Sequence, residues 1–181
     1  MSDTKTINRY STITIILHWL MLLLFVAVYA SIELRELFPK GSDPREALKA
    51  WHFMLGLSVL ILVVVRIYGR LTSITPPITP TPAAWQTLAA KLAHLALYGI
   101  MIAMPLLGWV ILSAAGKPIP FFGFELPAVV AENKELAKSL KELHETIGVL
   151  GYYLIGLHAG AAVFHHHVMK DDTLTRILHK H

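Results

Sequence analysis

Long apolar stretches alternate with shorter polar connections along this chain. Four stretches, at about residues 12–32, 48–69, 87–113 and 144–169, are long enough to cross roughly 30 Å of hydrocarbon as helices of about 20 residues. Most charged residues lie between these stretches or at their ends. The pattern predicts an all-α membrane protein, a four-transmembrane-helix bundle in which residues 1–181 form a single membrane-embedded domain.

The connections carry their own signals. The segment SITPPITPTP cannot form a helix, because it contains Pro76, Pro77, Pro80 and Pro82. We expect it to be a stiff extended connector. The longest connection, residues 114–143, begins with GKPIPFFGFELP and continues as AENKELAKSLKE, which predicts a short surface helix before the fourth span. Pro105 predicts a kink in the third span.

The topology is only partly determined by the sequence. The apolar run after MSDTKTINRY is too long for a cleavable signal peptide, so we expect the first span to stay in the membrane. Because four is an even number, both termini lie on one side. Lys and Arg divide eight and eight between the two sides, so their distribution does not decide the orientation.

The composition leaves histidine as the residue that can hold a redox centre. The chain is 55% hydrophobic and has no cysteine, which excludes disulfides, thiolate-ligated haem, covalent c-type haem and cysteine-held iron–sulfur clusters. It has ten histidines, and several lie inside apolar runs, where a polar ring is costly without a function. The net charge is +4, but the basic residues flank apolar segments, so we exclude nucleic acid binding.

Two histidines of the fourth span share one helix face. His144 and His158 are fourteen residues apart, so their directions differ by about 40° and their heights by about 21 Å. That spacing suits two stacked haems, each held by one ligand from this helix and one from another.

Depth in the membrane then selects the partners. His18 falls in the layer of His158, and His52 falls in the layer of His144. These two pairs are the predicted axial ligands of two haem irons. A lone membrane histidine can instead hydrogen-bond to a neighbouring helix, and His144 can be an interfacial residue. His94 shares the layer of the first pair, and we expect it to be a non-ligand, since one iron takes only two imidazoles.

Several segments together resemble a known family. They are RYSTITIILHWL, AWHFMLG, TPPITPTP, LAHLALYGIMIAMPLLGWV and LHETIGVLGYYLIGLHAGAAVFHHHVMKDDTL, and they cover nearly the whole chain. The sequence resembles the bacterial diheme cytochrome b-561 family. The resemblance implies an oxidoreductase of the bacterial inner membrane with both termini cytoplasmic. Superoxide would be oxidised to oxygen on the periplasmic side, and its electrons would pass through two haems b to ubiquinone.

The resemblance also implies roles for individual residues. The ligands again fall on the first, second and fourth spans, with His18 and His158 on the cytoplasmic side and His52 and His144 on the periplasmic side. Near the cytoplasmic haem, His94 and His165 are the candidate quinone site. Arg9 and Arg66 would contact haem propionates or anchor helix ends. A cationic approach for superoxide would use Lys117, Lys134, Lys138 and Lys141, unless these lysines are simply solvated. Catalysis would need no side chain beyond the haem, and no obligatory protein partner is expected.

Two other functions remain open. An electron-transfer and anchor subunit of a dehydrogenase or hydrogenase would need a partner surface, and only residues 114–143 offer one. A histidine-lined metal transporter would use His165, His166 and His167 as its uptake site. These three histidines are too closely spaced for a haem pair, and a solvated helix end is the simplest interpretation.

Overall fold

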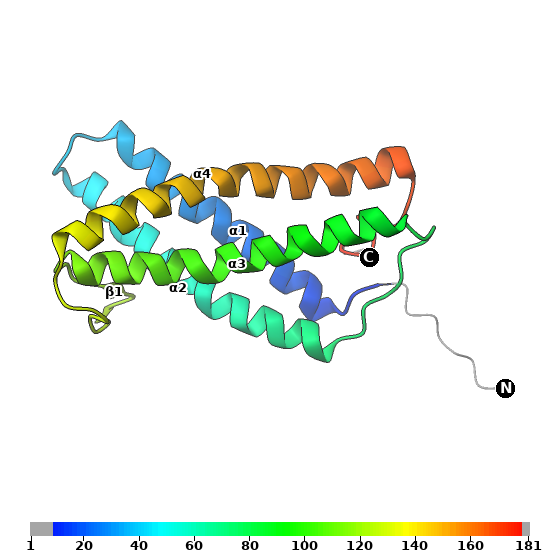
Figure 1. The fold of residues 1–181 in the computed structure, drawn as a ribbon, viewed down its shortest axis with the longest axis horizontal. Helices are drawn as coiled ribbons and strands as arrows, with labels where there is room; N and C mark the ends of the chain where they lie inside the picture. The colour runs from blue at the N-terminus through cyan, green and yellow to red at the C-terminus, as the bar shows by residue number, and fades with distance from the viewer. Residues whose placement is uncertain (1–8, 179–181) are drawn as a thin grey trace.

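The computed structural model describes residues 9–178. Four long helices form an elongated bundle (Figure 1): α1 Thr12–Leu34, α2 Asp43–Thr72, α3 Ala84–Ala114 and α4 Lys134–Phe164. All four are long and apolar enough to cross a membrane. The predicted all-α, four-transmembrane-helix architecture is therefore confirmed. Two short helical segments follow α1 and α4, namely η1 Arg35–Leu37 and η2 His165–Met169. The connection between α3 and α4 contains two short strands, β1 Pro120–Phe121 and β2 Phe124–Glu125.

The outer faces of the helices are apolar. Leu23, Leu95 and Tyr153 are 65%, 69% and 74% exposed, and many other large hydrophobic side chains also point outward. A water-facing surface of this kind would aggregate, whereas lipid tails solvate it at no cost. The chain is a multi-pass membrane protein.

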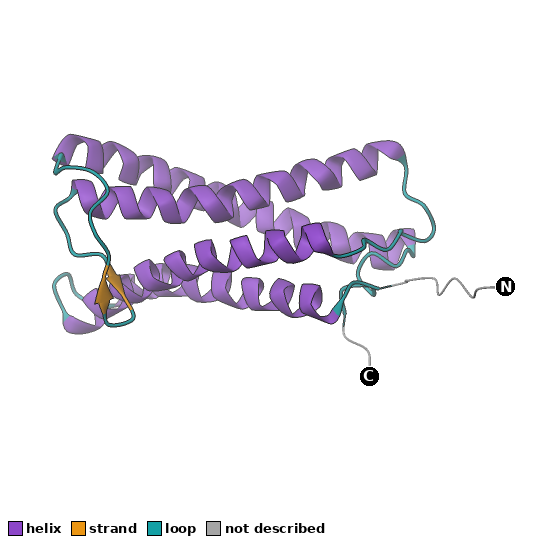
Figure 2. Cartoon of the chain, turned by 90° about the horizontal axis from the view of Figure 1, so that it is seen from below, coloured by secondary structure: helices purple, strands orange, loops and turns teal. Residues whose placement is uncertain are grey.

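The two ends of the bundle differ. The chain enters and leaves at one end, called here the terminal end (Figure 1). The opposite end, called here the loop end, carries the α1–α2 turn and the β1–β2 hairpin (Figure 2). The hairpin rests on a buried cluster of Leu57, Leu112 and Ile119 from α2, α3 and the connection.

Helix packing leaves α4 apart from half of the bundle. Helix α1 packs on α2, α2 on α3, and α3 on α4. Within the described residues, no Cα atom of α4 comes within 8 Å of a Cα atom of α1 or α2. The tight core instead joins α1, α2 and α3, through Met21, Val59, Val63 and Met101. Only side chains therefore bridge α4 to α1 and α2.

Helix α4 starts earlier than the sequence pattern predicts. The side chain of Asn133 caps it by accepting from the backbone N–H of Leu136 at 3.0 Å. No glycine or proline occurs between Lys134 and Ile147, so nothing interrupts the helix before the membrane. The expected separate surface helix is instead the first part of α4. Helix α3 runs on through Pro105, and the proline connector is non-helical as predicted.

The α1–α2 turn is fastened by one buried cation. The Arg45 guanidinium donates to the carbonyls of Arg35 and Phe38 at 3.0 and 2.9 Å and to both Glu36 oxygens at 2.9 and 3.0 Å. Hydrogen bonding and charge from Arg45 hold the pKa of Glu36 below its usual value. The loop end is thus closed by a bidentate ion pair and two carbonyls.

Candidate functional site

At the loop end, one imidazole from α2 faces one from α4. The ring centroids of His52 and His144 are 6.2 Å apart, with planes at 74°. Nδ1–H of His52 donates a hydrogen bond to the Val28 carbonyl at 3.0 Å, which leaves Nε2 of the neutral ring with a free lone pair. The Met104 carbonyl lies beside the His144 ring. Backbone groups of α1 and α3 thus orient this pair.

At the terminal end, three imidazoles gather. The centroids of His18 on α1 and His158 on α4 are 6.3 Å apart. His94 on α3 lies 5.3 Å from His158, with the planes at 72°. The structure therefore brings together all the histidines that the depth argument placed in this layer. It adds that His94 contacts the α4 member of the pair.

The two facing pairs have the separation expected for two imidazoles on one metal ion. Two imidazoles bound on opposite sides of one metal at about 2.0–2.1 Å would place their centroids about 6 Å apart. The measured separations are 6.3 and 6.2 Å. Each pair also joins α4 to a helix whose Cα atoms all lie more than 8 Å from those of α4. The residues present therefore fit haem at both ends.

A cation with an unused donor lies beside the terminal-end pair. Nη2 of Arg66 is 3.1 Å from Nδ1 of His18. Its Nη1 is buried and has no hydrogen-bond partner among the described residues. A buried guanidinium nitrogen without a partner is costly, and a haem propionate would satisfy it. Arg9 is exposed at the bend before α1, and within residues 9–178 no hydrogen bond or ion pair joins it to this layer.

A tyrosine next to Val28 ties α1 to α4. The Tyr29 hydroxyl donates to the Gly148 carbonyl at 2.9 Å, one helical turn beyond His144. Its ring packs on Tyr152 at 4.1 Å, and the Tyr152 hydroxyl donates to Glu33 at 2.9 Å. Two successive residues of α1 therefore contact both helices that carry the histidines of the loop-end pair.

The two candidate quinone residues occupy different surroundings. His94, on α3, lies against His158 of α4. His165, on η2, lies against Phe164 and Asp171. The rings of His166 and His167 are 4.8 Å apart. Among residues 9–178, no group of three or more histidine and carboxylate side chains converges as a metal site, so the metal-transporter alternative gains no support.

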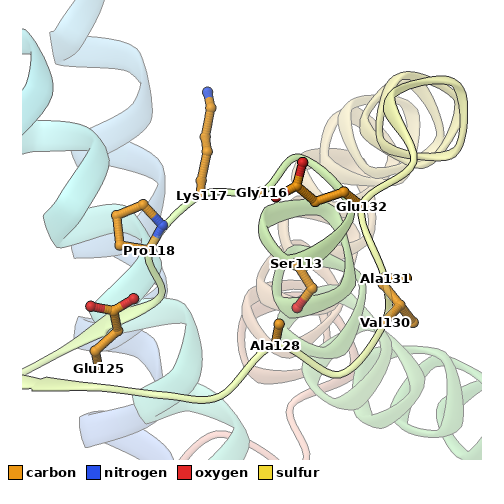
Figure 3. A pocket seen from close by; sticks show the side chains of 9 residues that line it. All are labelled: Ser113, Gly116, Lys117, Pro118, Glu125, Ala128, Val130, Ala131 and Glu132. Carbon is orange, nitrogen blue, oxygen red and sulfur yellow. The ribbon is translucent and has the colours of Figure 1, made fainter.

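A surface pocket of about 480 Å³ opens at the loop end between α3 and the connection to α4. Figure 3 shows Glu125 and Glu132 among its lining residues, with Lys117 extending away from them. Lys141, another of the expected cationic residues, pairs with Glu145 at 2.6 Å. Carboxylates therefore offset part of the positive charge of the loop end, whereas Lys134 and Lys138 are exposed and form no ion pair within residues 9–178.

Sequence reasoning missed the residues that orient the histidines. Val28 and Met104 act through backbone carbonyls, and no sequence signal marks a carbonyl that is used in this way. Tyr29 lies within an apolar run, so the sequence pattern does not single it out. Asp171 did carry a signal, because an acidic pair directly follows the histidine-rich helix end.

Known proteins are similar to this chain over nearly its whole length. The sequence model of the family "Prokaryotic cytochrome b561" matches residues 9–180. The chain is 42% identical to cytochrome b561 homolog 1 of Escherichia coli K12, over 94% of this chain and 97% of that one. It is 39% identical to the probable superoxide oxidase CybB of Yersinia pestis, over 96% and 97%. Cytochrome b561 homolog 2 of Escherichia coli K12 is 32% identical, over 99% and 96%.

Proposed function

Because this chain belongs to the prokaryotic cytochrome b561 family, and is therefore a membrane protein that binds b haem and transfers electrons, we propose that it is a superoxide:ubiquinone oxidoreductase. In this proposal the loop end faces the periplasm and the terminal end faces the cytoplasm of a bacterial inner membrane. Residues 1–181 act as one domain, without an obligatory protein partner.

The observation that carries the proposal is the presence of two facing imidazole pairs at opposite ends of one bundle, at 6.2 and 6.3 Å. We assign His52 and His144 as axial ligands of a periplasmic haem b, and His18 and His158 as those of a cytoplasmic haem b. The haems supply one-electron redox centres at the two ends. The similarity to a probable superoxide oxidase supports superoxide as the donor.

The residues around each pair suit the two half-reactions. If both imidazoles of the loop-end pair hold the iron of a haem, superoxide would give up its electron without bonding to the metal. Lys134 and Lys138 attract the small anion. For each ubiquinone reduced, two superoxide anions are oxidised to two molecules of oxygen, and two protons are taken up.

The terminal end supplies the protons. His94 and His165 hydrogen-bond the quinone carbonyls and pass on protons from the cytoplasmic side. Arg66 binds a propionate. With haem bound, His18 would keep its proton on the ring nitrogen that does not hold iron, so Arg66 would leave its present contact with His18 and pair with that acid.

The test is an anaerobic superoxide pulse given to the oxidised, detergent-purified protein, with the haem absorption bands followed with and without ubiquinone. We expect two haems per chain, rapid haem reduction, and reoxidation only when quinone is present. Haems that superoxide reduces slowly would instead support the electron-transfer and anchor subunit of a dehydrogenase or hydrogenase. A protein without haem would contradict the ligand assignment itself.

A further inference from the structure

The chain reverses sharply just after α4. The last turn, His165–Met169, is a π-helix, a wider form that is often found at functional sites. Lys170 then adopts a left-handed conformation with φ of 55°, which is uncommon for a residue other than glycine. This reversal returns Asp171 to the first residue of the π-helix, His165.

Asp171 is held firmly against that histidine. Its side chain is buried, and Oδ2 lies 2.5 Å from Nδ1 of His165. Oδ1 accepts from the backbone N–H of Thr173 at 2.9 Å, and the Asp171 N–H donates to the His165 carbonyl at 3.2 Å. Both carboxylate oxygens and the backbone are therefore used to set the orientation of one imidazole.

This contact fixes which ring atom of His165 stays available. Nδ1 donates to Asp171, so Nε2 is the only remaining polar atom of the ring. A quinone carbonyl can only accept a hydrogen bond. The ring can therefore bind quinone only when both of its nitrogens carry protons, and a carboxylate on the far nitrogen compensates the resulting charge.

We propose that Asp171 is a positioning residue for quinone reduction: it aims Nε2–H of His165 at a quinone carbonyl and balances the charge of the protonated ring. The inference rests on the proposed function, since it names the proton-donating unit of the same site. The ring delivers one of the two protons that the two-electron reduction of ubiquinone to ubiquinol consumes, and water at the terminal end returns it.

The charged residues near His165 and Asp171 interact with other groups. Burial alone would raise the pKa of Asp171, but hydrogen bonds from His165 and Thr173 hold it below its usual value. Arg176 pairs with Asp172 at 3.3 Å and, like Arg70 of α2, lies over the Tyr10 ring before α1. The other titratable groups on the same segment are His166, His167 and Lys170.

The test uses the purified haem-loaded protein, reduced chemically and mixed anaerobically with a short-chain ubiquinone. Haem reoxidation is followed over a range of quinone concentrations and pH values. In Asp171→Asn we expect the maximal rate to fall about 10- to 100-fold, the range for a residue that orients an essential histidine. The dependence of the rate on pH should also change, because the variant lacks the carboxylate that balances the charge of the protonated ring.

Two further variants separate positioning from structure. Asp171→Glu should recover most of the rate and of the pH profile. Asp172→Asn, the matched control, removes the neighbouring carboxylate that pairs with Arg176, and it should behave as the wild type. Haem content and spectra, measured for every variant, establish that the bundle is intact.

The outcomes separate the proposed function from the role of Asp171. If the wild type is not reoxidised by quinone, the proposed function fails and the inference fails with it. If the wild type is reoxidised but Asp171→Asn keeps its rate and pH profile, only the role of Asp171 is overturned. Equal slowing of the Asp171→Asn and Asp172→Asn proteins would overturn it too, by showing that this segment matters only for structure.

Discussion

The loop end and the terminal end present facing imidazoles at almost the same separation, 6.2 and 6.3 Å, but surround them differently. At the loop end, Nδ1 of His52 donates a hydrogen bond to the backbone carbonyl of Val28, and the Met104 carbonyl lies beside the His144 ring. At the terminal end there is a third imidazole, His94, and a guanidinium with one unused donor.

The difference indicates a division of labour. Backbone carbonyls are neutral and do not exchange protons, so the groups that contact the loop-end pair fit the electron-transfer half of the proposed function. Titratable and cationic side chains surround the terminal-end pair, where the proposed reaction must bind an acceptor and supply protons. In the proposed function, one bundle would thus combine an electron-only site with a proton-coupled site about 21 Å away along α4.

The strongest test of the comparison removes the imidazoles one at a time. His52→Ala and His18→Ala should each leave one haem per chain in place of two, because a bis-imidazole site loses one of its two axial bonds. His94→Ala, the matched control within the terminal end, should leave two. The measurement is haem per protein by extraction; one haem in the His94→Ala protein would show that His94 is a ligand.

The next test concerns charge at one end only. Arg66→Gln should lower the midpoint potential of the terminal-end haem by on the order of 50 mV, near the 59 mV that equals a tenfold change for one electron, because a nearby cation favours the reduced form. Redox titration of both haems measures it. Arg70→Gln is the control, since Arg70 lies over Tyr10. An equal shift of both potentials in Arg66→Gln would show that the two ends are not electrostatically separate.

A smaller effect is expected from the tie between α1 and α4. Tyr29→Phe removes the hydrogen bond to the Gly148 carbonyl and should lower the free energy of unfolding by about 1 kcal/mol. Thermal denaturation in detergent measures it, with Tyr153→Phe as the control because that side chain is 74% exposed. Gly151→Ala should mimic the loss, because a Cβ there would overlap the Tyr29 hydroxyl. Unchanged stability in both variants would remove Tyr29 from the account of the loop end.

The smallest effect is a pH dependence of the α1–α2 turn. The pKa of Glu36 is lowered from its usual 4.5 by Arg45, so its contribution is present above 4.5 and is lost as pH falls through the lower value of the folded protein. The wild type should therefore lose more thermal stability than Glu36→Gln as the pH is taken below 4.5. Parallel losses in the two proteins would show that this ion pair contributes nothing.

How far the sequence predicts the candidate site can be judged from particular residues. Helical rise and bilayer thickness are constants, so depth follows from counting residues, and His18 was matched with His158 and His52 with His144 on that basis. The contact of His94 with His158 was not predictable, because depth says nothing about rotation of α3. The assignment of any of these residues as a ligand stays a prediction until haem is measured.

The sequence by itself determined the number of spans, the common side of the termini and the layers in which the histidines lie, because each depends on local hydrophobicity and helix geometry alone. Only the tertiary structure decided that α4 stands apart from α1 and α2, that Val28 orients His52, and that Asp171 folds back onto His165. These features depend on how separate segments pack and turn in three dimensions, and a linear pattern does not encode which backbone carbonyl or carboxylate will face a given ring.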